Sequence, residues 1–133
     1  MSDNKPAHGT FCWMELITRD TAGAKKFYSE LIGWDASDSG MPGMDYTLFK
    51  AGDTDAGGLF AMPAEVPAQV PSHWMAYIAV DDVDSLVDKV KELGGTILQG
   101  PQDVPGVGRF VTVQDPAGAT VSLIKLSPPE NQS

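Results

Sequence analysis

Three side chains in two stretches of this sequence have the chemistry to move a proton or to hold a polar ligand. Glu15 lies within FCWMELIT, and His73 and Tyr77 lie within SHWMAYIAV. A carboxylate in a dry site acts as a general base or accepts a hydrogen bond from a cationic or hydroxyl-bearing ligand. An imidazole shuttles protons near neutral pH, and a phenol donates a hydrogen bond. These residue types predict a site for proton transfer or for a polar group on a small molecule.

Each of these residues also has an ordinary structural interpretation. Glu15 would be a strand-end carboxylate bonded to a neighbour or to water, His73 a rim histidine bonded to backbone, and Tyr77 a packed residue with a satisfied hydroxyl. Arg109 follows a Gly-Val-Gly run and would either clamp a carboxylate or phosphate or form a surface ion pair. The residues alone leave both interpretations open.

The sequence contains an internal repeat, in which the second half resembles the first with an offset of 62 residues. Asp20 matches Asp82, and Gly33 matches Gly95. Two similar half-sheets of this kind can close around one cavity. The expected fold class is therefore α+β: a single domain in which two tandem βαβββ modules form a curved mixed sheet around one cup-shaped cavity. The expected repeats are 10–63 and 72–126, joined by a Pro-rich linker at 63–71.

Turn and cap residues delimit the elements of each half. Asp20 and Asp82 are the expected helix N-caps, and glycines end both helices. The expected strands are 11–18, 34–36, 46–51, 57–62, 72–80, 96–99, 109–114 and 119–125.

Alternation in the first strand of each half separates two faces of the predicted sheet. A wholly apolar face carries Cys12, Met14 and Leu16, and then Trp74, Ala76, Ile78 and Val80. A mixed face carries Phe11, Trp13 and Glu15, and then His73, Met75 and Tyr77. We expect the apolar face to lie under the helices and the mixed face to line the cavity. The only cysteine is expected to be a small core residue.

Four motifs in this order resemble the vicinal oxygen chelate superfamily, which includes glyoxalase I, bleomycin resistance proteins and extradiol dioxygenases. The resemblance covers about Phe11 to Leu126 and is closest to glyoxalase-like members. It implies the paired βαβββ architecture around a cup, and it implies a homodimer. The motifs are WMEL-x₃-D, A-x₂-FY-x₂-L-x-GW, HWMAYIAVDDVD and GRF-x₄-DPAGA-x₂-SL.

The resemblance also supplies a test for a metal. Metal-using members place ligands, usually His or Glu, on the first and fourth strands of each module. The equivalent positions here are Trp13, Phe60, Met75 and Ser122. Indole and phenyl rings offer no donor, and a thioether or hydroxyl is a poor ligand for these cations. We expect no metal and no other cofactor, with a two-ligand site at Glu15 and His73 as the alternative.

Composition and charge argue against two classes of binding partner. The net charge is −9, and only nine Lys and Arg residues are present, which argues against nucleic acid and anionic membranes. The sequence shows neither a signal core nor an apolar run long enough to span a membrane, so a cytoplasmic location is the expectation.

We expect a glyoxalase/bleomycin-resistance/dioxygenase-like protein that binds a small organic molecule without a metal in an aromatic-lined cavity. Whether it is an enzyme stays open. The alternative is a lyase or isomerase, similar to lactoylglutathione lyase, with Glu15 as base and with or without a non-standard divalent metal. A third reading is an interaction module with a collapsed cavity. The expected ligand contacts are Trp13, Glu15, Phe60, His73, Met75, Tyr77, Arg109 and Ser122.

Overall fold

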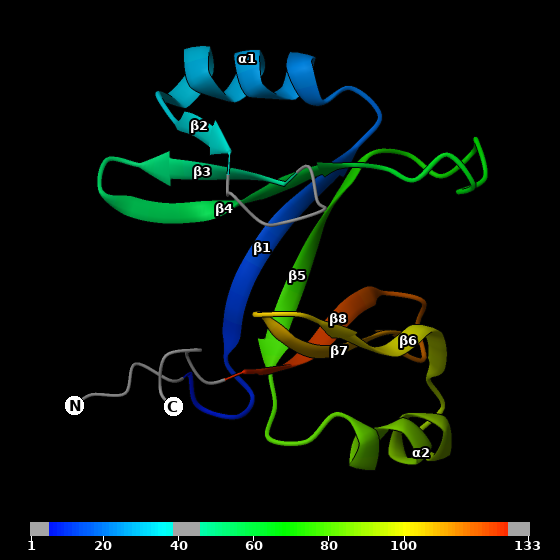
Figure 1. The fold of residues 1–133 in the computed structure, drawn as a ribbon. Coiled ribbons are helices and arrows are strands. Elements are labelled where there is room, and N and C mark those ends of the chain that lie inside the picture. Colours follow the sequence, from blue (N-terminus) through cyan, green and yellow to red (C-terminus); the bar gives the residue numbers. More distant parts are fainter. Residues whose placement is uncertain (1–5, 39–45, 128–133) are drawn as a thin grey trace. The chain divides into compact units, whose positions relative to one another are not determined.

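The computed structural model describes residues 6–38 and 46–127. The order strand, helix and three strands occurs twice along the chain (Figure 1). The first half contains β1 (Phe11–Thr18), α1 (Thr21–Ile32), β2 (Asp35–Asp38), β3 (Thr47–Ala51) and β4 (Thr54–Ala61). The second contains β5 (His73–Ala79), α2 (Asp84–Glu92), β6 (Thr96–Val104), β7 (Gly108–Gln114) and β8 (Thr120–Leu126). Neither helix of the described chain is long and apolar enough to cross a membrane.

The eight strands form one mixed sheet. Their hydrogen-bonded order is β2-β3-β4-β1-β5-β8-β7-β6. The first strand of each half pairs in parallel with the last strand of that half, whereas the hairpins β2–β3–β4 and β6–β7–β8 are antiparallel. The predicted α+β class with two βαβββ modules is confirmed.

The chain divides into two compact units whose boundaries fall inside β1 and β5. Unit 1 comprises Met1–Trp13 and Ala76–Ser133, and unit 2 comprises Met14–Met75. In unit 1, the Gly9 amide donates to the Ala79 carbonyl at 2.7 Å and the Ala79 amide donates to Thr10 at 2.8 Å. β1 and β5 therefore each have one end in unit 1 and the other end in unit 2. The boundaries of the two units thus differ from the boundaries of the two sequence repeats.

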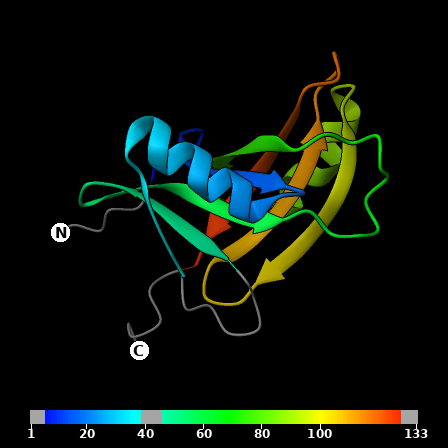
Figure 2. The ribbon, with the colours of Figure 1, turned by 90° about the horizontal axis from the view of Figure 1, so that it is seen from above.

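In unit 2, α1 packs on the sheet and runs across β3 and β4 (Figure 2). Asp20 caps the helix as predicted, since its carboxylate accepts from the Gly23 amide at 2.9 Å. Gly33 ends the helix at φ 79°, a left-handed conformation that favours glycine. The buried core comprises Leu16, Phe49 and Leu59, with Ala24, Tyr28, Trp34 and Ala56 packed against it.

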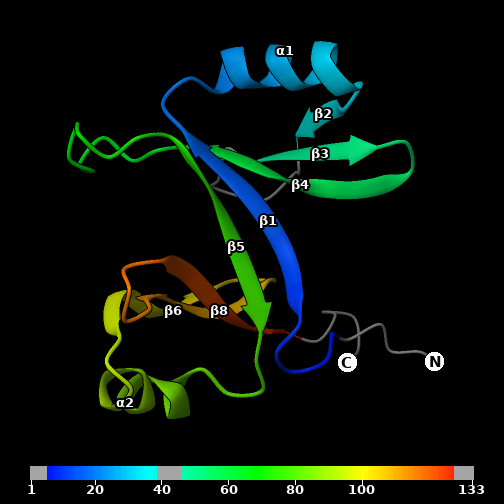
Figure 3. The same ribbon diagram turned by 180° about the vertical axis from the view of Figure 1, so that it is seen from behind.

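In unit 1, α2 lies beside β6 (Figure 3). The cap prediction at Asp82 was wrong, because the helix begins at Asp84 after Val83, and no side chain caps it. Asp84 in the first turn still complements the positive end of the helix dipole. The core comprises Val80, Val83, Val111 and Val113, with Ile78, Leu86, Val90, Ile97, Val121 and Leu123 against it. The prediction for the apolar face of the first strands is thus confirmed for Leu16 beneath α1 and for Ile78 and Val80 beneath α2. It was wrong for Met14, which is exposed, and for Trp74, which contacts Tyr28 of α1.

Two strands are longer than their sequence patterns indicate. β6 continues to Val104 through Pro101, where the sequence analysis ended a strand at 99. It accommodates the proline because it is the last strand of the order and its register with β7 shifts twice in that region. β4 begins at Thr54 because backbone pairing with β3 holds even its Gly-rich segment.

The Pro-rich linker is held by hydrogen bonds from Arg19, the residue just before the N-cap of α1. The Arg19 guanidinium donates from Nη2 to the carbonyls of Pro67 and Val70, both at 2.9 Å. The Arg19 amide donates to the Ser72 hydroxyl at 3.1 Å. The linker is irregular, as three prolines require, yet it is tied to the unit that precedes it.

The Cys12 thiol is half-buried in unit 1. Burial raises its pKa above the ordinary value, and a hydrogen bond to its own backbone only partly offsets this. Because the thiolate is the reactive form, we expect the folded protein to react with iodoacetamide more slowly than the urea-unfolded chain, with a rate that still rises between about pH 8 and pH 10. Mass spectrometry of the alkylated fraction measures both rates. Equal rates in the two states would contradict the expectation.

Candidate functional site

Glu15 is a buried carboxylate within the sheet, with 6% of its surface exposed. It lies on β1, and its partner on the parallel strand β4 is Gly58. The next residue, Leu16, packs into the core beneath α1. Since side chains alternate along a strand, Glu15 points to the face of the sheet away from α1. The predicted separation of the two faces is confirmed at this strand.

Tyr46 holds this carboxylate. The Tyr46 side chain is 9% exposed and precedes β3 directly, and its hydroxyl donates to Glu15 Oε1 at 2.8 Å. The phenol reaches Glu15 by passing over Gly58, where a side-chain Cβ would overlap the Tyr46 hydroxyl and ring. Gly58 is therefore required for the buried hydrogen bond, and the requirement comes from space rather than from backbone conformation.

An aromatic ring lies next to the hydrogen-bonded pair of Glu15 and Tyr46 in unit 2. The Phe60 ring lies 6.1 Å from the Tyr46 ring, with the two planes tilted by 32°. Phe60 pairs with Ile17, two residues along β1 from Glu15, so it lies on the same face. Unit 2 thus brings a carboxylate, a phenol and a phenyl ring together. Such a group of side chains can accept a hydrogen bond from the polar end of a ligand and contact its apolar part.

The corresponding face of unit 1 carries a row of hydroxyl side chains. Tyr77 on β5 pairs with Ser122 on β8, which pairs with Thr112 on β7. Ser122 is fully buried, and its hydroxyl lies 2.8 Å from that of Thr112. The Phe110 ring lies 6.3 Å from the Tyr77 ring. The residues between these in sequence pack beneath α2, so the row lies on the face away from that helix.

The strand register corrects one predicted equivalence. Ser122 pairs with Tyr77, whereas Gly58 pairs with Glu15, the repeat-equivalent of Tyr77. The counterpart of Ser122 is therefore Gly58, and the prediction that it is Phe60 was wrong. The paired residues Glu15 and Gly58 are 43 positions apart in sequence, whereas Tyr77 and Ser122 are 45 positions apart. A constant repeat offset of 62 therefore does not hold at the last strand of each half.

Three other predicted ligand residues are placed individually. Met75 is buried in unit 2, with 8% of its surface exposed. His73 begins β5, and its Nδ1 lies 2.9 Å from the Pro71 carbonyl oxygen. This is the hydrogen bond to the backbone that a structural role for His73 predicts. Trp13 is half-buried and belongs to unit 1. For all three, contact with a ligand stays a prediction.

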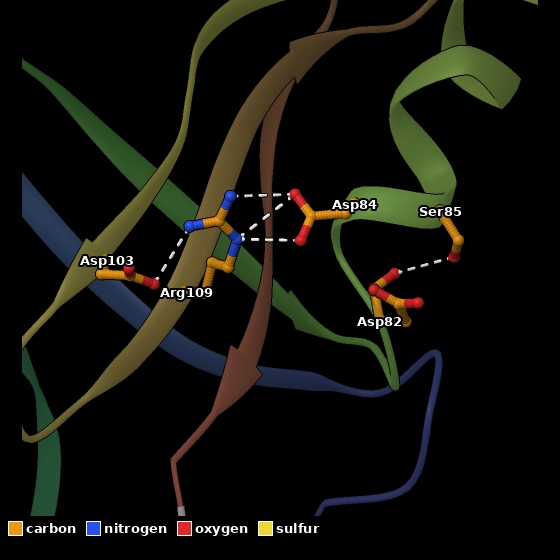
Figure 4. A network of polar contacts seen from close by, with 5 residues as sticks. All are labelled: Asp82, Asp84, Ser85, Asp103 and Arg109. Carbon is orange, nitrogen blue, oxygen red and sulfur yellow. Dashed lines mark hydrogen bonds and ion pairs between the residues drawn. The ribbon is translucent and has the colours of Figure 1, made fainter.

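Arg109 lies between two carboxylates (Figure 4). Its Nη2 and Nε donate to Asp84 at 2.9 and 3.1 Å, and its Nη1 donates to Asp103 at 3.1 Å. The hydrogen bonds to Asp84 and Asp103 raise the pKa of Arg109 above its ordinary value. These bonds place the guanidinium on the α2 side of β7, away from the face that bears Ser122 and Thr112. The surface ion pair is thus present, and a role as ligand clamp stays a prediction.

The side chains at the family's metal positions do not fit a divalent cation. With the corrected register, the four positions hold Trp13, Gly58, Met75 and Ser122, none of which is a carboxylate or an imidazole. The Ser122 hydroxyl is also engaged by Thr112. Over residues 6–38 and 46–127, His, Cys, Asp and Glu side chains form no group of three or more that could hold a metal ion.

Tyr46 is the residue of this candidate site that the sequence analysis missed. The sequence pattern places it at the start of a strand and gives it no role. The signal that could have found it is the adjacent pair Gly57-Gly58 within an otherwise apolar strand. Glycine inside a strand indicates that another group approaches the backbone closely, and here that group is the Tyr46 phenol.

The fold and the repeat identify the class of protein. A family model described as the Glyoxalase/Bleomycin resistance protein/Dioxygenase superfamily matches residues 10–123. The chain belongs to this superfamily.

Two curated relatives share substantial sequence identity with the chain. The Mycobacterium tuberculosis protein named "Putative glyoxylase CFP32" is 40% identical over 121 residues, which is 90% of this chain and 45% of the relative. The "Anthracycline biosynthesis protein DnrV" of Streptomyces peucetius is 34% identical over 118 residues, 89% of this chain and 42% of the relative. The chain thus spans about half the length of the curated relatives it matches.

A solved structure shares the fold at low sequence identity. Methylmalonyl-CoA epimerase from Mycobacterium tuberculosis superposes with a TM-score of 0.64 at 15% identity, over 96% of this chain and 94% of that chain. Identity at this level supports the architecture alone.

Proposed function

We propose that the protein binds a small organic molecule, without a metal, through the Glu15, Tyr46 and Phe60 face of unit 2. The ligand would have an aromatic or apolar body and a polar group that donates a hydrogen bond. The observation that carries this proposal is the burial of Glu15 with a hydrogen bond from a buried phenol. Burying a carboxylate is costly, so such arrangements are concentrated at functional sites.

The names of the relatives supply a ligand class to test. Two are named as anthracycline biosynthesis proteins, and anthracyclines are polycyclic aromatic compounds that bear hydroxyl groups. The Tyr46 and Phe60 rings suit the aromatic body of such a compound, and the Glu15 carboxylate suits a hydroxyl or amine. The remaining predicted contacts stay part of the proposal: Trp13, His73, Met75, Tyr77, Arg109 and Ser122.

A second candidate function is catalysis with Glu15 as a general base. The same buried carboxylate supports it, together with the glyoxylase name of two relatives. A lyase or isomerase of this kind would require Glu15 Oε atoms within hydrogen-bond reach of the substrate's acidic carbon, with Tyr46 fixing their orientation. Binding and catalysis predict different effects of replacing Glu15 with glutamine, its neutral amide.

The Glu15→Gln variant separates binding from catalysis. If Glu15 binds the ligand's donor, we expect affinity for an anthracycline, followed by its fluorescence, to fall about tenfold or more, because a charge-assisted hydrogen bond is lost. If Glu15 is a base, conversion of the methylglyoxal–glutathione hemithioacetal to S-lactoylglutathione should disappear in the variant, while binding of S-lactoylglutathione changes little. The exposed Glu92→Gln is the matched control.

Two results would contradict the proposed function. One is the absence of saturable binding of both compounds to the wild-type chain. The other is stoichiometric Zn, Ni, Fe or Mn in protein purified without added metal, with binding lost after dialysis against a chelator. Affinity unchanged by the chelator is the expected result.

A further inference from the structure

A hollow of about 240 Å³ lies in unit 1, beside the loop that joins β6 to β7. Val104 and Pro105 line it where that loop begins, and Leu126 lines it at the end of β8. Its volume is below the range of about 300–1,000 Å³ that is typical of pockets for drug-sized ligands. The hollow therefore suits a molecule of only a few non-hydrogen atoms.

A row of charged side chains from three adjacent strands lines the same hollow. Asp103 on β6 pairs with Arg109 on β7, and Arg109 pairs with Lys125 on β8. Paired residues on neighbouring strands lie on one face of a sheet, and like charges placed directly opposite each other are destabilising. Arg109 is compensated by Asp84 and Asp103, whereas Lys125 forms no ion pair with any residue in 6–38 or 46–127. A bound anion would balance the exposed Lys125 ammonium and offset its repulsion with Arg109.

The Arg109 guanidinium has two further donors for such an anion. Of its five N–H groups, the hydrogen bonds within the described chain use one each on Nε, Nη1 and Nη2. One N–H on Nη1 and one on Nη2 are left. In Figure 4, Asp84 and Asp103 lie on different sides of the guanidinium, and the edge between its two Nη atoms faces neither carboxylate. Two N–H groups along one edge of a guanidinium match the two oxygens of a carboxylate.

The charges around the hollow favour an anion with a single negative charge. Asp84 and Asp103 together with Arg109 and Lys125 carry no net charge, although the whole chain carries −9. A carboxylate is therefore repelled less here than over the rest of the acidic surface. A phosphate with two negative charges would be repelled more strongly than a carboxylate.

We propose that this hollow binds a small organic carboxylate, with its oxygens on Arg109 and Lys125 and its apolar part toward Val104 and Pro105. Arg109 then acts as a carboxylate clamp at a site separate from Glu15. The inference does not depend on the proposed function, because Glu15 belongs to unit 2, whereas every residue that lines the hollow belongs to unit 1.

An NMR titration of the 133-residue chain with sodium propionate tests the site. Propionate carries a carboxylate on a short apolar chain. We expect saturable shifts of amide signals within residues 104–109 and 125–127, with a Kd in the millimolar range because so small a ligand makes few contacts. Sodium chloride at equal ionic strength and neutral propionamide are the matched controls. Neither should shift these signals in a saturable way.

Two substitutions test the assigned contacts. Lys125→Gln should raise the Kd about three- to fivefold, as expected for the loss of an exposed ion pair. Arg109→Lys keeps the positive charge but removes the planar pair of donors, so propionate should bind at least about tenfold more weakly. Lys89→Gln is the matched control, because Lys89 is exposed on α2 of the same unit and does not line the hollow. Circular dichroism checks that the variants fold.

Three results would overturn the proposal. The first is a titration in which propionate gives no saturable shifts, or gives the same shifts as sodium chloride. The second is a folded Lys125→Gln variant that binds propionate as tightly as the wild type does. The third is tighter binding of inorganic phosphate than of propionate, which would contradict the charge argument for a carboxylate.

Discussion

Gly58→Ala is expected to lower the free energy of unfolding by about 3 kcal/mol, although alanine normally suits a strand better than glycine. The added methyl group would overlap the Tyr46 hydroxyl and ring, which are buried and cannot swing into solvent. Overpacking costs about 1–3 kcal/mol. Displacing the phenol also breaks its hydrogen bond to Glu15, and leaving a buried charged group without that donor costs about 1.5–3 kcal/mol. The usual gain of about 0.5–1 kcal/mol from replacing glycine offsets part of this.

Urea unfolding in two backgrounds isolates the cause. In the Tyr46→Ala background the methyl group has room, so Gly58→Ala should there be neutral or slightly stabilising. The change in sign between the two backgrounds is the signature of a steric conflict between these two residues. A loss of stability that is equal in both backgrounds would show that Gly58 is needed for another reason.

The alternation of side chains made the two faces of the sheet predictable. The apolar residues of each first strand repeat every second position, and Leu16 and Ile78 do pack beneath α1 and α2. A carboxylate on the other face of such a strand has few structural uses, so Glu15 was identifiable from one position in the sequence. The helix cap at Asp20 was predictable for the same reason, because capping is local.

Tyr46 was not predictable by these means because its role depends on contacts between distant segments. It acts on a residue 31 positions earlier, across a third strand whose Gly58 supplies the space. The constant repeat offset failed at Phe60 because the two halves differ in the length of their connections, which only the strand register records. The cap prediction at Asp82 was wrong because α2 begins one residue later than predicted, so that Val83 occupies the cap position.

The two faces of unit 2 follow from one strand pattern. β1 presents Glu15 to one side of the sheet and Leu16 to the other, where Phe49 and Tyr28 complete the core. The aromatic cluster on that second side then extends from buried Phe49 to exposed Phe27. The cluster therefore has a buried inner part that stabilises the fold and an exposed outer end.

Phe49→Ala and Phe27→Ala should reveal these two parts. Phe49 is fully buried, and its ring lies 5.0 Å from Trp34 and 6.0 Å from Tyr28. We expect its truncation to lower the free energy of unfolding by about 4 kcal/mol, which combines lost burial with the cavity left behind. Since domains are stable by only about 5–15 kcal/mol, this variant would be close to unfolding at room temperature.

Phe27→Ala removes a ring of the same size from the exposed end of the cluster. We expect the free energy of unfolding to change by no more than about 0.5 kcal/mol, as for other surface substitutions. In urea unfolding, Phe49→Ala should therefore lower the midpoint strongly, whereas Phe27→Ala should leave it close to the wild-type value. Equal losses of stability for the two variants would show that Phe27 is part of the core.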